Sequence, residues 1–429
     1  MPTAHGSFRG GLSVADSPDN FTQTVYAAFE DEIYTVLSDG QIKYFGDLPG
    51  TDKIFISRNQ NASVDVVIVC EAGAYYINGG AISAYPDSDV GTGSSAPVCM
   101  TYHDGYFMFG YRDGDIFASG LNAVTINTLD AANAASNADG LVQLWSYSGQ
   151  LYAAGEKTIE VWGYPVNNAG FPLTRVGYHI TPGLISPHCV AGFEPEWGNP
   201  PIYVGTDNTV RWLQGYQAQR ISTPDLERLI AEVEDQSTLE AIAYRSAGTA
   251  FWQLSCDDWT WVFNANNPGW FERKSDGSER SRFTGGAVYA FGTWLVGDTE
   301  TSNLLEIDHT VAYEGVGNNL TATIISPSIK AWPNRVRIAR ADFDLVVPAV
   351  TADTTAPTID ISWSDDGGAT FKNPLTRSLG DSTSDTVRRI TVLNTGYSHP
   401  MGRRWKLECS DQVDFALLGG DMAAEIRAK

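Results

Sequence analysis

The stretch Gly105–Leu121, GYFMFGYRDGDIFASGL, contains two short apolar runs that meet at a polar Asp-Gly turn. Aromatic and aliphatic runs joined by such a turn are typical of a β-hairpin. The same pattern occurs six more times in the first 310 residues, at hairpins that begin at Glu32, Val66, Gln150, Pro201, Ala250 and Gly292. One local structure is therefore used repeatedly along most of the chain.

The spacing of these hairpins predicts a β-propeller. Successive hairpins begin 34 to 51 residues apart, close to the ~40–50 residues of one four-stranded blade. A single hairpin buries too little apolar surface to be stable, so blades must stack around an axis. A β-sandwich also has short strands, but seven near-equal repeats exceed its usual size. We therefore predict an all-β chain with a β-propeller of six or seven blades over residues 1–312, with Thr24–Phe29 in the first blade.

One segment departs from the strand pattern and predicts a helix. In Ser222–Val233, Ser222 or Thr223 is a suitable cap and Pro224 lies in the first turn. Apolar residues then follow helical spacing. The helix is expected to pack on the edge of a blade, and contact with a neighbouring subunit is the alternative.

The last part of the chain predicts a second domain. Residues 313–429 contain longer strands with alternating patterns, as expected of a small antiparallel β-sandwich. Over RVRIARADFDLVV, which begins at Arg335, strict alternation places Ala341 on the same face as Arg337 and opposite to Ile338.

Charge is distributed unevenly between the two parts. Residues 320–429 hold 13 basic and 13 acidic side chains, so the other 319 residues carry the whole net charge of −23. Such an acidic region repels nucleic acid at long range, although it equally serves solubility.

No stretch approaches the ~20 apolar residues of a membrane span, and we expect no signal peptide. The five cysteines form no pairing framework and are expected to be reduced and mostly buried.

Motifs for metal or nucleotide chemistry are not found in the sequence. It has no HExxH motif, no Cys/His cluster, no GxSxG elbow and no phosphate-binding loop. Asp113-Gly114-Asp115 lacks the spacing of a calcium loop and is interpreted as a hairpin turn. We therefore predict no metal and no cofactor.

The segment Ser364–Phe371, SDDGGATF, fits the pattern S-x-D-x-G-x-T-aromatic. The pattern resembles the Asp-box of sialidases, so a sialidase-like or carbohydrate-binding propeller is the alternative interpretation. A sialidase also needs an arginine triad, and Asp-boxes recur on several of its blades, whereas here one copy lies beyond the repeats. We predict a structural turn, because an Asp side chain and glycines of positive φ stabilise such turns. Its residues are Ser364, Asp366, Gly368, Thr370 and Phe371.

Two arginine pairs in the C-terminal part, Arg388-Arg389 and Arg403-Arg404, suggest either nucleic-acid binding or a protein interface. Aromatic residues are sparse around them and acids match them in number. We therefore favour an interface between subunits for Arg388, Arg389, Arg403 and Arg404.

Several segments taken in order resemble one family. They are the stretch 183–223, the predicted helix, AIAYRSAGTAFWQLS from Ala241, the Ser364–Phe371 turn, the strand Val387–Leu393 and the closing segment 403–421. Over most of residues 140–429 this order is similar to the packaged-DNA stabilisation proteins, or tail hub proteins, of short-tailed bacteriophages. The first 20 residues depart from the opening that is usual in that family.

The resemblance implies a structural virion protein without catalytic residues. Several copies, six in the family, would form a ring in the head–tail connector below the portal or its adaptor. The ring would extend the DNA channel, contact a tail needle, plug, fibre or tailspike, and retain the packaged DNA without binding it specifically. Such proteins are made in the bacterial cytoplasm and end in the virion.

Overall fold

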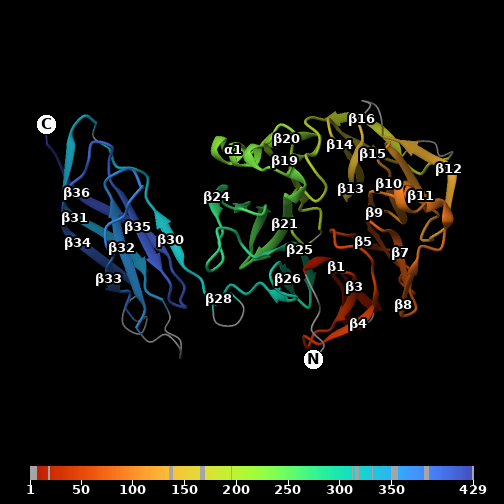
Figure 1. Ribbon diagram of the computed structural model, residues 1–429, viewed down its shortest axis with the longest axis horizontal. Helices are drawn as coiled ribbons and strands as arrows, with labels where there is room; N and C mark the ends of the chain where they lie inside the picture. Colours follow the sequence, from red (N-terminus) through yellow and green to blue (C-terminus); the bar gives the residue numbers. More distant parts are fainter. Residues whose placement is uncertain are drawn as a thin grey trace. The chain divides into compact units, whose positions relative to one another are not determined.

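A computed structural model describes residues 7–17, 20–134, 139–164, 170–194, 196–311, 313–314, 318–330, 332–348, 356–380 and 386–427. The chain divides into two compact units (Figure 1). Unit 1 comprises Met1–Lys274 and Ser278–Ile307, and unit 2 comprises Ser275–Gly277 and Asp308–Lys429. The boundary predicted at residues 312 and 313 includes Ala312, which lies outside the described residues.

Unit 1 contains seven antiparallel sheets in its described part, each built from consecutive strands. Blades 1 to 3 are β1 (Phe8–Ser17), β2 (Asn20–Phe29), β3 (Glu32–Val36) and β4 (Ile42–Asp47); β5 (Phe55–Arg58), β6 (Val66–Cys70), β7 (Gly73–Asn78) and β8 (Ala81–Ala84); and β9 (Cys99–His103), β10 (Tyr106–Gly110), β11 (Asp115–Ser119) and β12 (Ile126–Asn133). Blades 4 and 5 are β13 (Leu141–Tyr147), β14 (Gln150–Gly155), β15 (Ile159–Gly163) and β16 (Thr174–Ile180); and β17 (Val190–Ala191), β18 (Ile202–Val204), β19 (Val210–Gln214) and β20 (Gln217–Arg220). Blades 6 and 7 are β21 (Glu240–Ser246), β22 (Thr249–Ser255), β23 (Thr260–Asn264) and β24 (Gly269–Glu272); and the three strands β25 (Phe283–Ala290), β26 (Thr293–Asp298) and β27 (Leu304–Glu306). The all-β propeller prediction is confirmed, and the blade number is seven.

Alternation within the middle strands explains how the blades stack. In β6, Val66 and Ile68 belong to an apolar cluster with blade 1, whereas Val67 and Val69 belong to a cluster with blade 3. Successive strand residues point to opposite faces, so a strand that is apolar at every position is buried between two neighbouring blades. The core of unit 1 is accordingly a ring of layers between blades, and the outermost strands, such as β4 and β8, are largely exposed.

The ring is closed where blade 1 meets blade 7. Strand β1 lies beside β25, and Phe8 shares an apolar cluster with Val288 of β25. The backbone amide of Phe291 also donates to the Gln23 side chain of blade 1, at 2.6 Å. A Cβ at Gly297 would lie 2.3 Å from the Phe8 ring, so glycine is required for Phe8 to fill this seam.

Helix α1 (Pro224–Glu232) confirms the helix prediction. The Thr223 side chain caps it by accepting from the backbone amide of Leu226. Leu226 and Ile230 are buried in the apolar cluster that joins blades 4, 5 and 6. Three short 3₁₀ turns complete the helical segments that the structure describes: η1 (Ser88–Val90), η2 (Gly93–Ser95) and η3 (Gln236–Thr238).

Unit 2 contains two larger antiparallel sheets and one small pair of strands in its described part. The sheets have the strand orders β30-β35-β32-β33 and β34-β31-β36, and β28 pairs with β29. Residues of both larger sheets share one apolar cluster, which includes Phe343, Ile361 and Trp405. The strands are β28 (Tyr313–Glu314), β29 (Asn318–Asn319), β30 (Ala322–Ile325), β31 (Arg335–Val346), β32 (Thr358–Ser364), β33 (Leu375–Ser378), β34 (Val387–Tyr397), β35 (Arg404–Cys409) and β36 (Leu417–Arg427).

Strict alternation along β31 is wrong. The pairing of β31 with both neighbouring strands shifts between Ile338 and Arg340. A β-bulge at this point moves the following residues to the other face. Ala341 is therefore buried in the same cluster as Ile338, whereas Arg340 is exposed.

Candidate functional site

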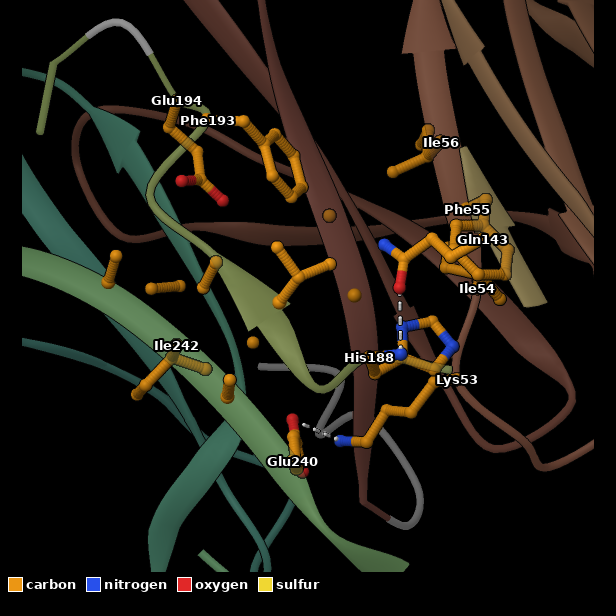
Figure 2. Close-up of a pocket in the computed structure, with 18 of the residues that line it drawn as sticks. Lys53, Ile54, Phe55, Ile56, Gln143, His188, Phe193, Glu194, Glu240 and Ile242 are labelled. Atoms are coloured by element: carbon orange, nitrogen blue, oxygen red, sulfur yellow. Dashed lines mark hydrogen bonds and ion pairs between the residues drawn. The ribbon is translucent and has the colours of Figure 1, made fainter. Parts of the chain in front are cut away.

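The centre of the propeller contains a small polar cavity of about 170 Å³ (Figure 2). The first strand of every blade, or the loop next to it, contributes to its wall. Residues such as Gly11, Ile56, Thr101, Gln143, Val190 and Ile242 line it, together with Ala287 of blade 7. Because β1 lies beside both β5 and β25, the cavity lies on the axis of a closed ring.

An ion pair spans one side of this cavity. The ammonium group of Lys53 lies 3.1 Å from a carboxylate oxygen of Glu240, and it also donates to the carbonyl oxygen of Phe8 at 3.1 Å. Lys53 precedes β5 and Glu240 begins β21, so the pair joins two blades that are far apart in sequence. These contacts hold the two blades together at the wall of the cavity and place one positive and one negative side chain there.

His188 lies at the same wall with its ring stacked on Phe55, and the ring centroids are 4.5 Å apart. Its backbone has a positive φ of 63°, and its amide donates to the Gln143 side chain at 3.0 Å. Burial, together with the nearby charge of Lys53, lowers the pKa of His188 to about 3. The ring is therefore neutral at physiological pH.

Glu194 points toward the cavity from the loop after β17 (Figure 2). One of its carboxylate oxygens accepts from the backbone amide of Gly192 at 2.8 Å. Burial raises the pKa of Glu194 to about 7, because the charged carboxylate loses hydration. The axis of the propeller thus holds a carboxyl group that titrates near neutral pH.

The size of the cavity limits its role. One water occupies ~30 Å³ of liquid, so the cavity has room for a few waters and not for a strand of nucleic acid. Among the residues that the structure describes, no group of three His, Cys, Asp or Glu side chains is arranged to hold a metal ion. The channel of one propeller is therefore not a path for DNA.

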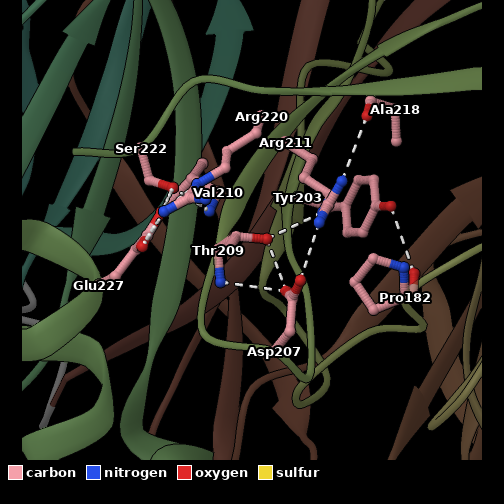
Figure 3. Close-up of polar contacts among 10 residues, drawn as sticks. All are labelled: Pro182, Tyr203, Asp207, Thr209, Val210, Arg211, Ala218, Arg220, Ser222 and Glu227. Carbon is pink, nitrogen blue, oxygen red and sulfur yellow. Dashed lines mark hydrogen bonds and ion pairs between the residues drawn. The ribbon is translucent and has the colours of Figure 1, made fainter. Parts of the chain in front are cut away.

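A polar network joins α1 to blade 5 (Figure 3). Arg220 of β20 pairs with Glu227 of the helix, and the Ser222 hydroxyl donates to the same carboxylate at 2.5 Å. On β19, the Arg211 guanidinium donates to Asp207 at 2.8 Å. Burial alone would raise the pKa of Asp207, but hydrogen bonds from Thr209 and Arg211 outweigh it, and the pKa is lowered. The contacts of Arg220 and Ser222 with Glu227 fix the helix on its blade, whereas the Arg211–Asp207 pair joins β19 to the turn before it.

The Ser364–Phe371 segment forms a turn between β32 and β33. The Ser364 hydroxyl donates to Asp366 at 2.6 Å and accepts from the backbone amide of Gly368 at 2.8 Å, and Asp366 accepts from the amide of Thr370 at 2.9 Å. Gly367 and Gly368 have positive φ values of 85° and 106°. The hydrogen bonds from Ser364 and Thr370 hold the pKa of Asp366 far below its usual range. The Phe371 ring lies under the Lys406 ammonium group, at 4.9 Å.

The four predicted interface arginines have different environments. Arg403 is 0% exposed, and its guanidinium donates to Asp365 at 2.8 Å and to the Thr395 carbonyl oxygen at 3.1 Å. It also lies over the rings of Trp363 and Trp405. The prediction for Arg403 is therefore withdrawn, because a side chain enclosed in its own unit cannot contact another protein.

The other three arginines lie nearer the surface. Arg389 is exposed on β34 and forms a two-pronged pair with Asp344, with both distances 2.7 Å. Arg388 is also exposed, and Arg404 is partly exposed beside Gly368. These three remain candidates for an interface.

The cysteines agree with the sequence prediction. All five are free and buried. Within the described part of the chain, no helix has the length and apolar character needed to cross a membrane.

Comparison with protein families identifies the family of the chain. Residues 3–312 match the family described as bacteriophage P22 Gp10, β-propeller. The chain belongs to this family. The Gp10 family comprises structural phage proteins that stabilise packaged DNA, so the predicted family is confirmed. The match covers unit 1, whereas three of the segments that suggested the family lie in unit 2.

Other comparisons are distant. The computationally designed protein Ika8 has 14% identity over 71% of this chain and 87% of its own, with a TM-score of 0.40. The RRP9 WD40 repeats have 11% identity over 69% and 89%, with a TM-score of 0.42. A chain of the mitotic checkpoint complex has 12% identity over 71% and 96%, with a TM-score of 0.41. No curated protein matches the sequence.

Proposed function

We propose that this member of the Gp10 family forms a ring of several copies, with six as the expected number, in the head–tail connector of a short-tailed bacteriophage. The ring lies below the portal or its adaptor, extends the DNA channel, contacts a tail needle, plug, fibre or tailspike, and retains the packaged DNA. The observation that carries this proposal is the family match across residues 3–312.

Two features of the chain support the proposal. Residues 1–319 carry the whole net charge of −23, and an acidic surface beside DNA avoids the phosphate contacts that would hold the passing duplex. The cavity on the propeller axis is too small for DNA, so the DNA path is expected to lie between copies.

The sialidase-like alternative has no observation in its favour. The Ser364–Phe371 turn is accounted for by its own hydrogen bonds, and its Asp side chain is used within the turn. The family comprises structural proteins, and we propose no catalytic residue.

Cryo-electron microscopy of the particles tests the location. We expect a ring of seven-bladed propellers at the vertex through which DNA is packaged, and we expect the purified protein not to bind duplex DNA at physiological salt. Density for this chain elsewhere in the particle, or tight and salt-sensitive DNA binding, would contradict the proposal.

A further inference from the structure

Two loops of unit 2 are tied together side by side. Ile329 and Arg403 exchange backbone hydrogen bonds of 2.8 and 3.1 Å. At the other end, the backbone amide of Ser398 donates to Val336 at 2.8 Å, and the Val336 amide donates to the Ser398 hydroxyl at 3.2 Å. These contacts join Ile329 to Arg403 and Val336 to Ser398, so the described residues Lys330 and Trp332 lie on a segment that is tied at both ends to the segment with His399 and Met401.

The tips of these loops expose large side chains. Trp332 is 71% exposed, Met401 is 51% exposed, and Tyr397, at the end of β34, is 49% exposed. Trp, Tyr and Met are enriched in protein interfaces, and anchors held in advance lose little entropy on binding. We call this surface the paired-loop tip and define it as Lys330, Trp332, Arg335, Tyr397, His399 and Met401.

The paired-loop tip also presents positive charge. Lys330 and Arg335 are exposed, and no ion pair joins either of them to a carboxylate in the described part of the chain. A partner that suits the tip therefore has an apolar recess with acidic residues around it.

The propeller has such a recess. A cleft of about 1080 Å³ lies at blades 2 and 3, where apolar residues such as Phe55, Val98 and Phe117 form part of its wall. Five carboxylates line it, those of Asp52, Glu71, Asp89, Asp113 and Asp115, and they outnumber the two cationic side chains of the lining, Lys53 and Arg112. None of the last three is in an ion pair with a described residue. We call this feature the acidic cleft.

We propose that the paired-loop tip of one copy docks in the acidic cleft of a second copy. Both surfaces are present on every copy, their charges are opposite, and the cleft has apolar walls and room for the Trp332 ring. A head-to-tail contact of this kind continues from copy to copy and closes into a ring when the rotation permits. The inference rests on the proposed function in one respect, since it assumes that several copies assemble.

Cross-linking in trans tests the contact. Because the five natural cysteines are buried, a short bis-maleimide should react selectively with introduced ones. His399→Cys protein is mixed at high concentration with Ser94→Cys protein, whose new thiol lies in the cleft, and the covalent dimer is quantified by mass. We expect a strong dimer product, and at least a fivefold lower yield with Ser83→Cys, which lies on the exposed strand β8 outside the cleft. Equal yields would overturn the proposal.

Charge reversal tests the chemistry of the contact. Lys330→Glu with Arg335→Glu should reduce the cross-linked product at least fivefold, and Asp89→Lys with Asp113→Lys in the Ser94→Cys partner should restore it. The matched control is Arg377→Glu, an exposed cation on β33, which should leave the yield unchanged. No loss with the double reversal, or equal loss with the control, would overturn the proposal.

DNA is the other partner that a basic aromatic surface could suit. Fluorescence anisotropy with single-stranded and duplex DNA measures this directly. Binding that Trp332→Ala abolishes, without any change in cross-linking, would overturn the docking proposal.

If cross-linking fails while particles still contain a ring of this protein, the docking contact is wrong and the proposed function stands. If particles contain no ring, the proposed function fails.

Discussion

At the scale of single residues, Arg403 shows how unit 2 uses charge inside its core. Its guanidinium is enclosed by two tryptophan rings and bonded to Asp365 and Thr395. A buried ion pair adds little net stability, but removal of one partner leaves the other unpaired and is costly.

Arg403→Met should lower the free energy of unfolding of unit 2 by about 1–3 kcal/mol, because it leaves the Thr395 carbonyl oxygen without this partner, while Asp365 is 26% exposed and can be hydrated. Urea titration followed by tryptophan fluorescence measures this, because Trp363 and Trp405 flank the guanidinium. The control Arg377→Met removes an exposed arginine and should change stability by less than about 0.5 kcal/mol. Equal stabilities of the two variants would show that the Arg403 contacts are not important for the fold.

Glu194, at the axis of unit 1, is expected to make the stability of the protein depend on pH. Its pKa is about 7 in the folded protein, above the ~4.3 of an unfolded chain. The folded state therefore binds more protons between these values, and this group makes the protein less stable as pH rises from about 4 to 7. The His188 ring, which is neutral when folded, contributes the opposite slope below about pH 6.5.

Glu194→Gln isolates the first contribution. The stability of the variant relative to the natural protein should increase as pH rises from 4 to 7 and then stay constant. Urea titrations of both proteins across this range measure the difference, in which the contribution of His188 cancels. A difference that does not vary with pH would show that Glu194 is ionised like an exposed carboxylate.

At the scale of elements, the seam between β1 and β25 closes the propeller. Phe8 fills it and requires Gly297 beneath its ring. Since a ring of stacked blades has one such closure, loss of this contact should open the ring there first.

Phe8→Ala should lower the free energy of unfolding by about 3–5 kcal/mol, as for other buried phenylalanines. Hydrogen exchange should show β1 and β25 losing protection before the middle strands of blades 3 and 4. Phe271→Ala on the exposed strand β24 is the matched control and should cost far less. Uniform loss of protection in the Phe8 variant would argue against a weak closure at this seam.

The sequence predicts the middle strands well because they are apolar at nearly every position, as in β6 and β15. Each of the seven hairpins predicted from the sequence lies in a different blade, as β10 and β18 show, and the structure decides between six and seven blades. Closure of the ring brings Lys53 and Glu240 together. This ion pair could not be predicted, because the two residues are 187 positions apart and no local sequence pattern indicates such a contact. The interface prediction for Arg403 is wrong because Arg403 is buried and Arg404 is partly exposed, and the sequence does not show which of two adjacent arginines faces the core.

At the scale of the whole molecule, an acidic propeller of the Gp10 family is followed along the chain by a second unit with no net charge over residues 320–429. The sandwich interpretation of this unit stays a prediction, supported by two sheets that share one apolar cluster. The proposed ring places many carboxylates near DNA, which favours passage of the duplex over binding.

The proposed role of the protein is to retain packaged DNA. The most direct measurement is the DNA content of particles assembled with and without this chain, determined after nuclease treatment. We expect particles without it to package DNA but to lose it to the nuclease, and we expect purified protein added back to freshly packaged heads to restore protection. Full retention of DNA in particles that lack the chain would contradict this role.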